Sequence, residues 1–217
     1  MRQRKAKDLE QRLEICSPYL IRDPEPQCWE KVFGNDNPIY LEIGCGKGNF
    51  ILQKALENPD KNYIAVEGQE TVILRALEKA REHDQEEGSR KLTNLKFMLT
   101  FVHRMADFFH EDQLAGVYLN FSDPWPKARH AKRRLTYHKR MEDYRWAIKP
   151  GGFVEIKTDN DPLYAFSLEE IQMMGYPILE QTTDLHASEF ESKKTMTEYE
   201  AKFHAAGKNI NYVKVGF

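Results

Sequence analysis

Short apolar runs and amphipathic stretches alternate along most of the chain. The apolar runs are rich in branched and aromatic residues and are bounded by turn residues, which is typical of strands inside a sheet. Strands are predicted at residues 39–43, 63–66, 94–102, 117–121, 153–158, 176–183 and 212–216. Apolar residues at helical spacing predict helices at residues 49–56, 69–84, 136–148 and 163–174. This alternation indicates an α/β fold with a mostly parallel sheet covered on both faces.

Length and composition limit the classes of protein. A chain of 217 residues is long enough for one α/β domain, expected at residues 35–217, after a basic N-terminal arm with short helices at residues 1–34. The three cysteines lack metal-ligand spacing and indicate free thiols in a reducing compartment. No apolar run is long enough to span a bilayer. The sequence therefore predicts a cytoplasmic protein with no metal and no membrane partner.

A glycine-rich loop joins the strand at residues 39–43 to the helix that follows it. Gly44, Gly46 and Gly48 allow a tight turn and a close approach of the backbone to a ligand. Glu67 ends the next strand, about 20 residues beyond the loop, where an acid can bind ribose hydroxyls. The loop is not G-x-G-x-x-G, so it lacks the geometry suited to a pyrophosphate. The loop resembles instead the first motif of class I methyltransferases, whose donor, S-adenosylmethionine, contains adenosine but no phosphate.

A rigid turn and a basic run follow the strand at residues 117–121. Pro124 and Pro126 restrict the backbone and hold Asp123 at a set angle just past the strand end. The run then carries Lys127, Arg129, His130, Lys132, Arg133 and Arg134. Because the formal net charge of the chain is −2, nucleic-acid binding would depend on such a local cluster. The alternative is a surface turn followed by a solvated basic face.

Four separated motifs resemble those of the tRNA (guanine-N7-)-methyltransferases, and the resemblance covers nearly the whole chain from Phe33 onward. The motifs are EIGCGKG at residues 42–48, NFSDPWPKARHAKRR at 120–134, KTDN at 157–160 and TEYE at 197–200. The resemblance implies a single Rossmann-like class I methyltransferase domain with an antiparallel C-terminal strand. It also implies S-adenosylmethionine as methyl donor and the guanine at position 46 in the variable loop of tRNA as acceptor.

The resemblance assigns roles residue by residue. Asp123 is expected to be the active-site acid. Donor contacts are implied for Glu42, Gly44, Gly46, Gly48, Glu67, Phe101 and Asp123. Substrate contacts are implied for Lys127, Asp159, Thr197, Glu198, Tyr199 and Glu200. RNA contacts are implied for Arg129, His130, Ala131, Lys132, Arg133 and Arg134. The partners are then tRNA and the donor, and the chain could be a monomer or a homodimer.

Two positions depart from the family pattern. Phe101 stands where an acidic residue that helps to hold the donor's adenine is common, and Asp161 stands where an arginine is common. The first departure bears on donor binding, and the second bears on a phosphate contact near the substrate.

The expected chemistry needs no general base, because N7 of guanine carries a lone pair and no proton. Catalysis then depends on alignment and electrostatics, and Asp123 could orient the guanine edge and favour the positive charge on the ring. Trp125 could stack on a flipped base or fill space. Thr197 and Glu200 have the spacing of a helix capping box. Two other functions remain: a methyltransferase for small molecules or proteins, and a non-catalytic RNA-binding protein.

Overall fold

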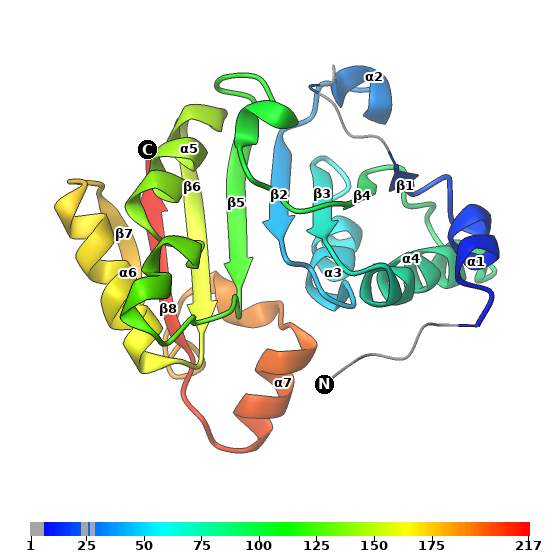
Figure 1. Ribbon diagram of the computed structural model, residues 1–217. Coiled ribbons are helices and arrows are strands. Elements are labelled where there is room, and N and C mark those ends of the chain that lie inside the picture. Colours follow the sequence, from blue (N-terminus) through cyan, green and yellow to red (C-terminus); the bar gives the residue numbers. More distant parts are fainter. Residues whose placement is uncertain (1–6, 23–25, 27–28) are drawn as a thin grey trace.

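The computed structural model describes residues 7–22, 26 and 29–217. Within these residues a twisted sheet of eight strands has the order β1-β4-β3-β2-β5-β6-β8-β7 (Figure 1). The strands are β1 (Leu20–Ile21), β2 (Ile39–Ile43), β3 (Asn62–Glu67), β4 (Leu95–Leu99), β5 (Leu114–Asn120), β6 (Ile148–Thr158), β7 (Ile178–Thr182) and β8 (Asn211–Gly216). The residues predicted for β2 and β3 lie in these strands, and those predicted for β5 do so except Phe121, which begins the turn that follows.

The strand directions confirm the predicted fold. The neighbours from β1 to β6 are all parallel, whereas β8 runs antiparallel to both β6 and β7. The chain moves outward from β2 to β3 and β4 and then returns to place β5 on the other side of β2. In such sheets ligands bind beyond the carboxyl ends of the strands at the point where the order reverses. That point lies between β2 and β5.

Helices cover both faces of the sheet. They are α1 (Leu9–Ile15), α2 (Trp29–Phe33), α3 (Asn49–Glu57), α4 (Glu70–Gln85), α5 (His138–Ala147), α6 (Asp161–Met173) and α7 (Glu198–Ala205). One core contains buried side chains of α1, α3 and α4, and the other contains those of α2, α5 and α6. By contrast, α7 lies beyond the arrowheads of the parallel strands (Figure 1). It therefore borders the edge at which a ligand is expected.

The composition of β5 follows from its position at the centre of the sheet. Every residue of this strand is buried, and the strand pairs with β2 on one side and β6 on the other. A strand that is buried on both faces favours branched and aromatic residues without alternation. The strand ends at Asn120, so the turn that follows it starts at the carboxyl edge.

Other details also differ from the sequence prediction. The strand predicted at residues 94–102 ends at Leu99, and the chain continues as a loop. The strand predicted at residues 153–158 begins at Ile148, because Ile148 already pairs with Leu114 before a register shift. The two residues of β1, too short to show a period, pair with Phe97 and Met98. The boundary at residue 34 stays a prediction.

Parts of the N-terminal prediction fall outside the described residues. These parts are the basic residues 1–6 and Cys28, whereas Cys16 and Cys45 are buried free thiols. None of the helices within the described part of the chain is long and apolar enough to cross a membrane.

Candidate active site

The glycine loop between β2 and α3 is held open toward the edge of the sheet. Gly44, Gly46 and Gly48 have φ angles of 80°, 58° and 77°, which residues with a side chain rarely adopt. The N–H groups of Gly44 and Cys45 both donate to the carbonyl of Val66, at 2.8 and 2.9 Å, and so attach the loop to β3. A Cβ built on Gly44 or Gly46 would meet no atom within 4 Å. The loop therefore leaves room for a ligand against its backbone.

Glu67 lies beside this loop, as the spacing predicted. One carboxylate oxygen accepts a hydrogen bond from the Gly46 N–H at 3.2 Å, and the other accepts one from the Gln69 N–H at 3.0 Å. These bonds fix the orientation of the acid. Carboxylate oxygens have further lone pairs, so Glu67 can still accept hydrogen bonds from ribose hydroxyls.

Glu42 is a buried acid next to the same loop. Its side chain is 1% exposed, and one oxygen accepts a hydrogen bond from the Asn120 amide at 2.9 Å. The other oxygen has no hydrogen-bond partner within the described residues. Burial raises the pKa of Glu42 from 4.5 to about 7, although the hydrogen bond from Asn120 opposes the shift. Asn120 was not predicted as a site residue, although it opens the quoted NFSDPWP motif.

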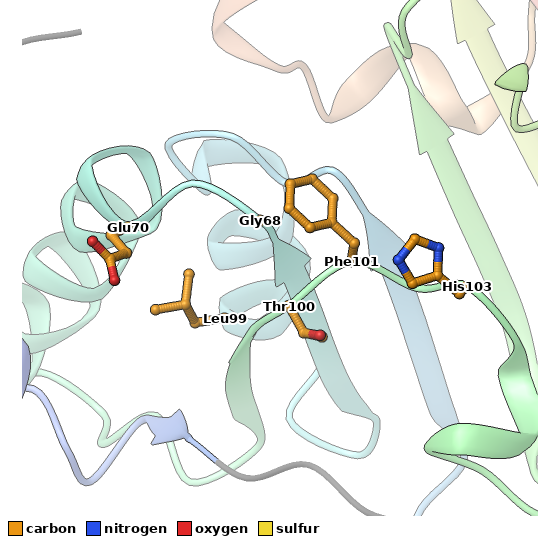
Figure 2. A pocket seen from close by; sticks show the side chains of 6 residues that line it. All are labelled: Gly68, Glu70, Leu99, Thr100, Phe101 and His103. Carbon is orange, nitrogen blue, oxygen red and sulfur yellow. The ribbon is translucent and has the colours of Figure 1, made fainter.

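Phe101 follows β4 and forms one side of an open pocket. The pocket has a volume of about 600 Å³ and is lined by Gly68, Glu70, Leu99, Thr100, Phe101 and His103 (Figure 2). The side chain of Phe101 is 63% exposed, and its ring lies so close to Gly68 that a Cβ there would stand 2.2 Å from it. The Phe101 ring therefore covers the backbone of Gly68, which directly follows Glu67. The resemblance noted above would place an acid at position 101 in place of this ring.

Asp123 lies in the turn after β5, and its side chain is accessible to solvent. It forms no hydrogen bond or ion pair with residues 7–22, 26 or 29–217. The turn begins at Phe121, whose N–H donates to the Lys157 carbonyl at 2.8 Å. Phe121 and Trp125 have φ angles of 53° and 41°, in the left-handed region. Each such residue costs on the order of 1 to 3 kcal/mol, so the turn persists because its surroundings hold it.

The basic run forms a short 3-10 helix over Ala128–Arg133. The side chains of Lys127, Arg129, Lys132 and Arg133 are exposed, whereas His130, Ala131 and Arg134 are partly buried. The His130 ring meets Trp125 edge-on at 5.8 Å, and the Arg133 guanidinium lies 4.8 Å from the Trp125 ring centroid. The run therefore forms a cationic surface directly beside the Asp123 turn.

The TEYE segment begins α7 and includes the predicted capping box. The Thr197 hydroxyl accepts a hydrogen bond from the Glu200 N–H at 3.0 Å. The Glu200 side chain is 0% exposed and pairs with Lys157 at 3.1 Å, and His186 Nε2 lies 3.2 Å away. The carboxylate of Glu200 therefore faces the protein interior in this structure.

Glu198 and Tyr199 are more accessible to solvent than Glu200. Glu198 pairs with Lys79 of α4 at 2.6 Å, and the same ammonium group donates to the Lys47 carbonyl at 3.0 Å. Tyr199 is 63% exposed. The pair with Lys79 ties α7 to the glycine loop, far away in the sequence. No signal in the sequence distinguished Lys79, which lies in an ordinary amphipathic helix.

The two aspartates after β6 are both engaged by the C-terminal part of the chain. Asp159 pairs with Lys208 at 2.7 Å, and Asp161 accepts a hydrogen bond from Asn211 at 2.8 Å. Asn160 between them caps α6 through a bond from the Leu163 N–H at 2.9 Å. The KTDN motif thus lies at the carboxyl edge, where Asp159 is 24% exposed by side chain.

Similarity to known proteins extends over nearly the whole chain. A family model described as a putative methyltransferase matches residues 36–213. The tRNA (guanine-N(7)-)-methyltransferase of Mesoplasma florum is 45% identical over an alignment that covers 97% of this chain and 96% of that protein. The protein of the same name from Streptococcus uberis is 41% identical, with 100% of both chains covered.

Solved structures with little sequence identity share the fold. The 16S rRNA methyltransferase KamB superimposes with a TM-score of 0.62 at 11% identity, covering 88% of this chain and 93% of that chain. An antibiotic-related methyltransferase gives a TM-score of 0.61 at 14% identity, covering 87% and 92%. The fold is that of the class I methyltransferases.

Proposed function

This chain belongs to the tRNA (guanine-N(7)-)-methyltransferase family, and on that premise we propose that it methylates N7 of the guanine at position 46 in the variable loop of tRNA. The methyl donor is S-adenosylmethionine. The observation that carries the proposal is the arrangement at the carboxyl edge: an open glycine loop with Glu67 lies on one side, and an exposed acid beside a cationic surface lies on the other.

The donor side of the edge fits an adenosine-containing cation. Gly44 and Gly46 leave space against the backbone, and Glu67 supplies oriented carboxylate oxygens for ribose. Glu42 offers a buried oxygen close to the loop that has no partner in the part of the chain that the structure describes. The donor carries an electrophilic methyl group on a sulfonium, whose positive charge a neighbouring carboxylate stabilises. Phe101 gives the adenine pocket an aromatic ring in place of the common acid.

Asp123 is the residue to which we assign the acceptor. The exposed carboxylate can accept hydrogen bonds from the guanine edge and so hold N7 toward the donor. Positive charge spreads over the purine as the bond to N7 forms, and a fixed carboxylate favours that charge. N7 carries no proton, so no side chain has to remove one. Trp125, in the same turn, can stack on a flipped base.

The remaining assignments divide the edge between substrate and RNA backbone. We assign the RNA backbone to Arg129, Lys132 and Arg133, which are exposed cations, and we assign the exposed Lys127 to the substrate. Thr197, Glu198 and Tyr199 border the edge at the start of α7, together with Asp159 from the end of β6. We place the enzyme in the cytoplasm, where tRNA is modified. It acts as a monomer or a homodimer.

The decisive experiment is transfer of a radiolabelled methyl group from the donor to unmodified tRNA, followed by nuclease mapping of the product base. We expect label at the variable-loop guanine. A matched tRNA with 7-deazaguanine at that position keeps the base edge but lacks N7, so it should take no label. Label on a peptide, or at another tRNA position, would contradict the proposal.

A donor-site variant provides the enzyme control. In Gly46→Val a branched side chain enters the open space at a φ of 58°, which is strained for any residue but glycine. Calorimetry with S-adenosylmethionine should show no binding, whereas tRNA binding persists. Wild-type protein that binds tRNA but no donor would instead identify a non-catalytic RNA-binding protein.

A further inference from the structure

Arg134 differs from the other cations of the basic run in what it contacts. Its Nε donates to the Pro124 carbonyl at 3.0 Å, and its Nη2 donates to the Trp125 carbonyl at 3.1 Å. On its other side the guanidinium lies 4.2 Å from the centroid of the Phe166 ring, which belongs to α6. The guanidinium is therefore fixed by contacts within the protein on two sides, and it is partly buried.

The two carbonyls belong to the part of the turn that directly follows Asp123. Trp125 has a φ of 41°, a conformation that a bulky residue adopts only when neighbouring groups hold it there. Proline at 124 and 126 supplies no N–H, so the turn has few donors of its own with which to close. The fork of the Arg134 guanidinium supplies two donors in a rigid plane.

We propose that Arg134 is a positioning residue for the methyl transfer: it holds the Pro124–Trp125 backbone against α6 and so fixes the direction of the Asp123 carboxylate. The inference rests on the proposed function for its consequence in catalysis, but the contacts themselves are independent of it. It also reassigns Arg134, which the sequence resemblance counted among the RNA-binding residues. Two of its N–H donors bind backbone carbonyls of the turn.

The neighbouring residue Arg133 differs from Arg134 in its contacts. Arg133 is exposed, and its guanidinium lies over the Trp125 ring at 4.8 Å without a hydrogen bond to the turn within the described residues. Arg133 is therefore free to contact a phosphate, whereas two of the five N–H donors of Arg134 are already bound to carbonyls of the turn. Adjacent residues of the same type thus have different tasks.

Charge-preserving variants separate the two tasks. Arg134→Lys keeps the positive charge but loses the planar fork, and Phe166→Leu removes the ring beneath the guanidinium without changing any charge. For both variants we expect the single-turnover rate at saturating tRNA and donor to fall about 10-fold or more. Affinity for tRNA and its salt dependence should stay at the wild-type level. Arg145→Lys, at an exposed position of α5, is the control for activity, and its single-turnover rate should stay near the wild-type value. Arg133→Lys is the control for the conformation of the turn.

Amide hydrogen exchange tests the positioning without RNA. Peptides that cover residues 119–128 should exchange about 10-fold faster in Arg134→Lys and in Phe166→Leu, but not in Arg133→Lys. If the wild-type protein methylated no tRNA, the proposed function would be wrong. The hydrogen-exchange measurement would still show whether Arg134 holds the turn. Unchanged exchange, or a wild-type rate in Arg134→Lys, would overturn the inference. So would an Arg134→Ala variant whose salt slope falls by about 0.7 to 0.9, as expected for a lost phosphate contact.

Discussion

The Asp123 turn and the TEYE segment at the start of α7 lie at the same edge of the sheet, but their acids have opposite environments. Asp123 is exposed and has no partner within the described residues. Glu200 is 0% exposed and pairs with the buried Lys157, while its backbone N–H completes a helix cap. One acid is free to meet a substrate, and the other is engaged by the fold.

The difference shows what an acid in a motif can mean. Two prolines follow Asp123 within a turn that points outward, whereas Glu200 lies on the side of α7 that faces Lys157. Both residues belong to motifs that resemble those of the family. Substrate contact by Glu200 stays a prediction, and the structure supports an indirect role through the position of α7. Four variants and one set of ligands can break or sharpen this comparison.

Glu200→Gln should have the largest effect, which is a loss of folding stability. It leaves Lys157, 1% exposed by side chain, as a buried cation without its carboxylate. Breaking a buried pair in this way typically costs about 3 to 5 kcal/mol of unfolding free energy, which urea denaturation would measure. Glu198→Gln is the matched control, because its partly exposed pair with Lys79 should contribute at most about 1 kcal/mol. A stable Glu200→Gln protein with weakened tRNA binding would contradict this reading.

Glu42→Gln sharpens the comparison, because Glu42 is buried like Glu200 but has no paired cation among the described residues. Its pKa is raised from 4.5 to about 7 by burial, so the folded state binds the proton more tightly than the unfolded state. Stability should therefore fall as pH rises from about 4.5 to 7, with a total loss of about 3 kcal/mol. Without donor, the variant should unfold at a higher temperature than wild type at pH 8. We expect Glu42→Gln and the wild type to have nearly equal melting temperatures at pH 5, and the difference between them to grow toward pH 8.

Asp123→Asn tests the open side of the comparison. It keeps the shape and one acceptor but removes the charge that favours the methylated purine. We expect a single-turnover rate lower by roughly 10²-fold, near-normal tRNA affinity, and unfolding free energy within about 0.5 kcal/mol of wild type. The wild-type rate should show no strong rise with pH near neutrality, since N7 needs no deprotonation. Methylation by the variant at the wild-type rate would make the acid structural.

The paired replacement of Lys132 and Arg133 by Ala tests the cationic surface next to the turn. Both side chains are exposed, and Arg134 is left intact because its donors bind the turn. Each lost phosphate contact should lower the slope of log affinity against log salt by about 0.7 to 0.9, while donor affinity stays unchanged. An unchanged slope would show that these residues form a solvated face.

The sequence predicted the framework well because β2, β3 and β5 carry strong apolar runs. It also predicted that Glu67 lies by the glycine loop, since strand, loop and helix lengths fix that distance. It could not predict the pairing of Glu198 with Lys79, which depends on how α7 folds back over the edge. The inward direction of Glu200 and the contacts of Arg134 were hidden for the same reason. Glu200 pairs with Lys157, and the Arg134 guanidinium packs on Phe166, so both side chains depend on how remote parts of the chain fold together.

The Phe101 ring over Gly68 has a consequence for selective inhibition. A carboxylate at this position, which the resemblance to the family leads us to expect, could accept a hydrogen bond from the amino group of adenine, whereas the phenyl ring of Phe101 offers an apolar face. Donor analogues that carry unsubstituted purine, or an alkyl group on the exocyclic nitrogen, should therefore lose little affinity for this enzyme. Competition titrations against S-adenosylmethionine, with Phe101→Asp as the comparison protein, would measure the preference. A compound that binds the wild type and spares the aspartate variant would be a lead for discriminating between members of one enzyme family.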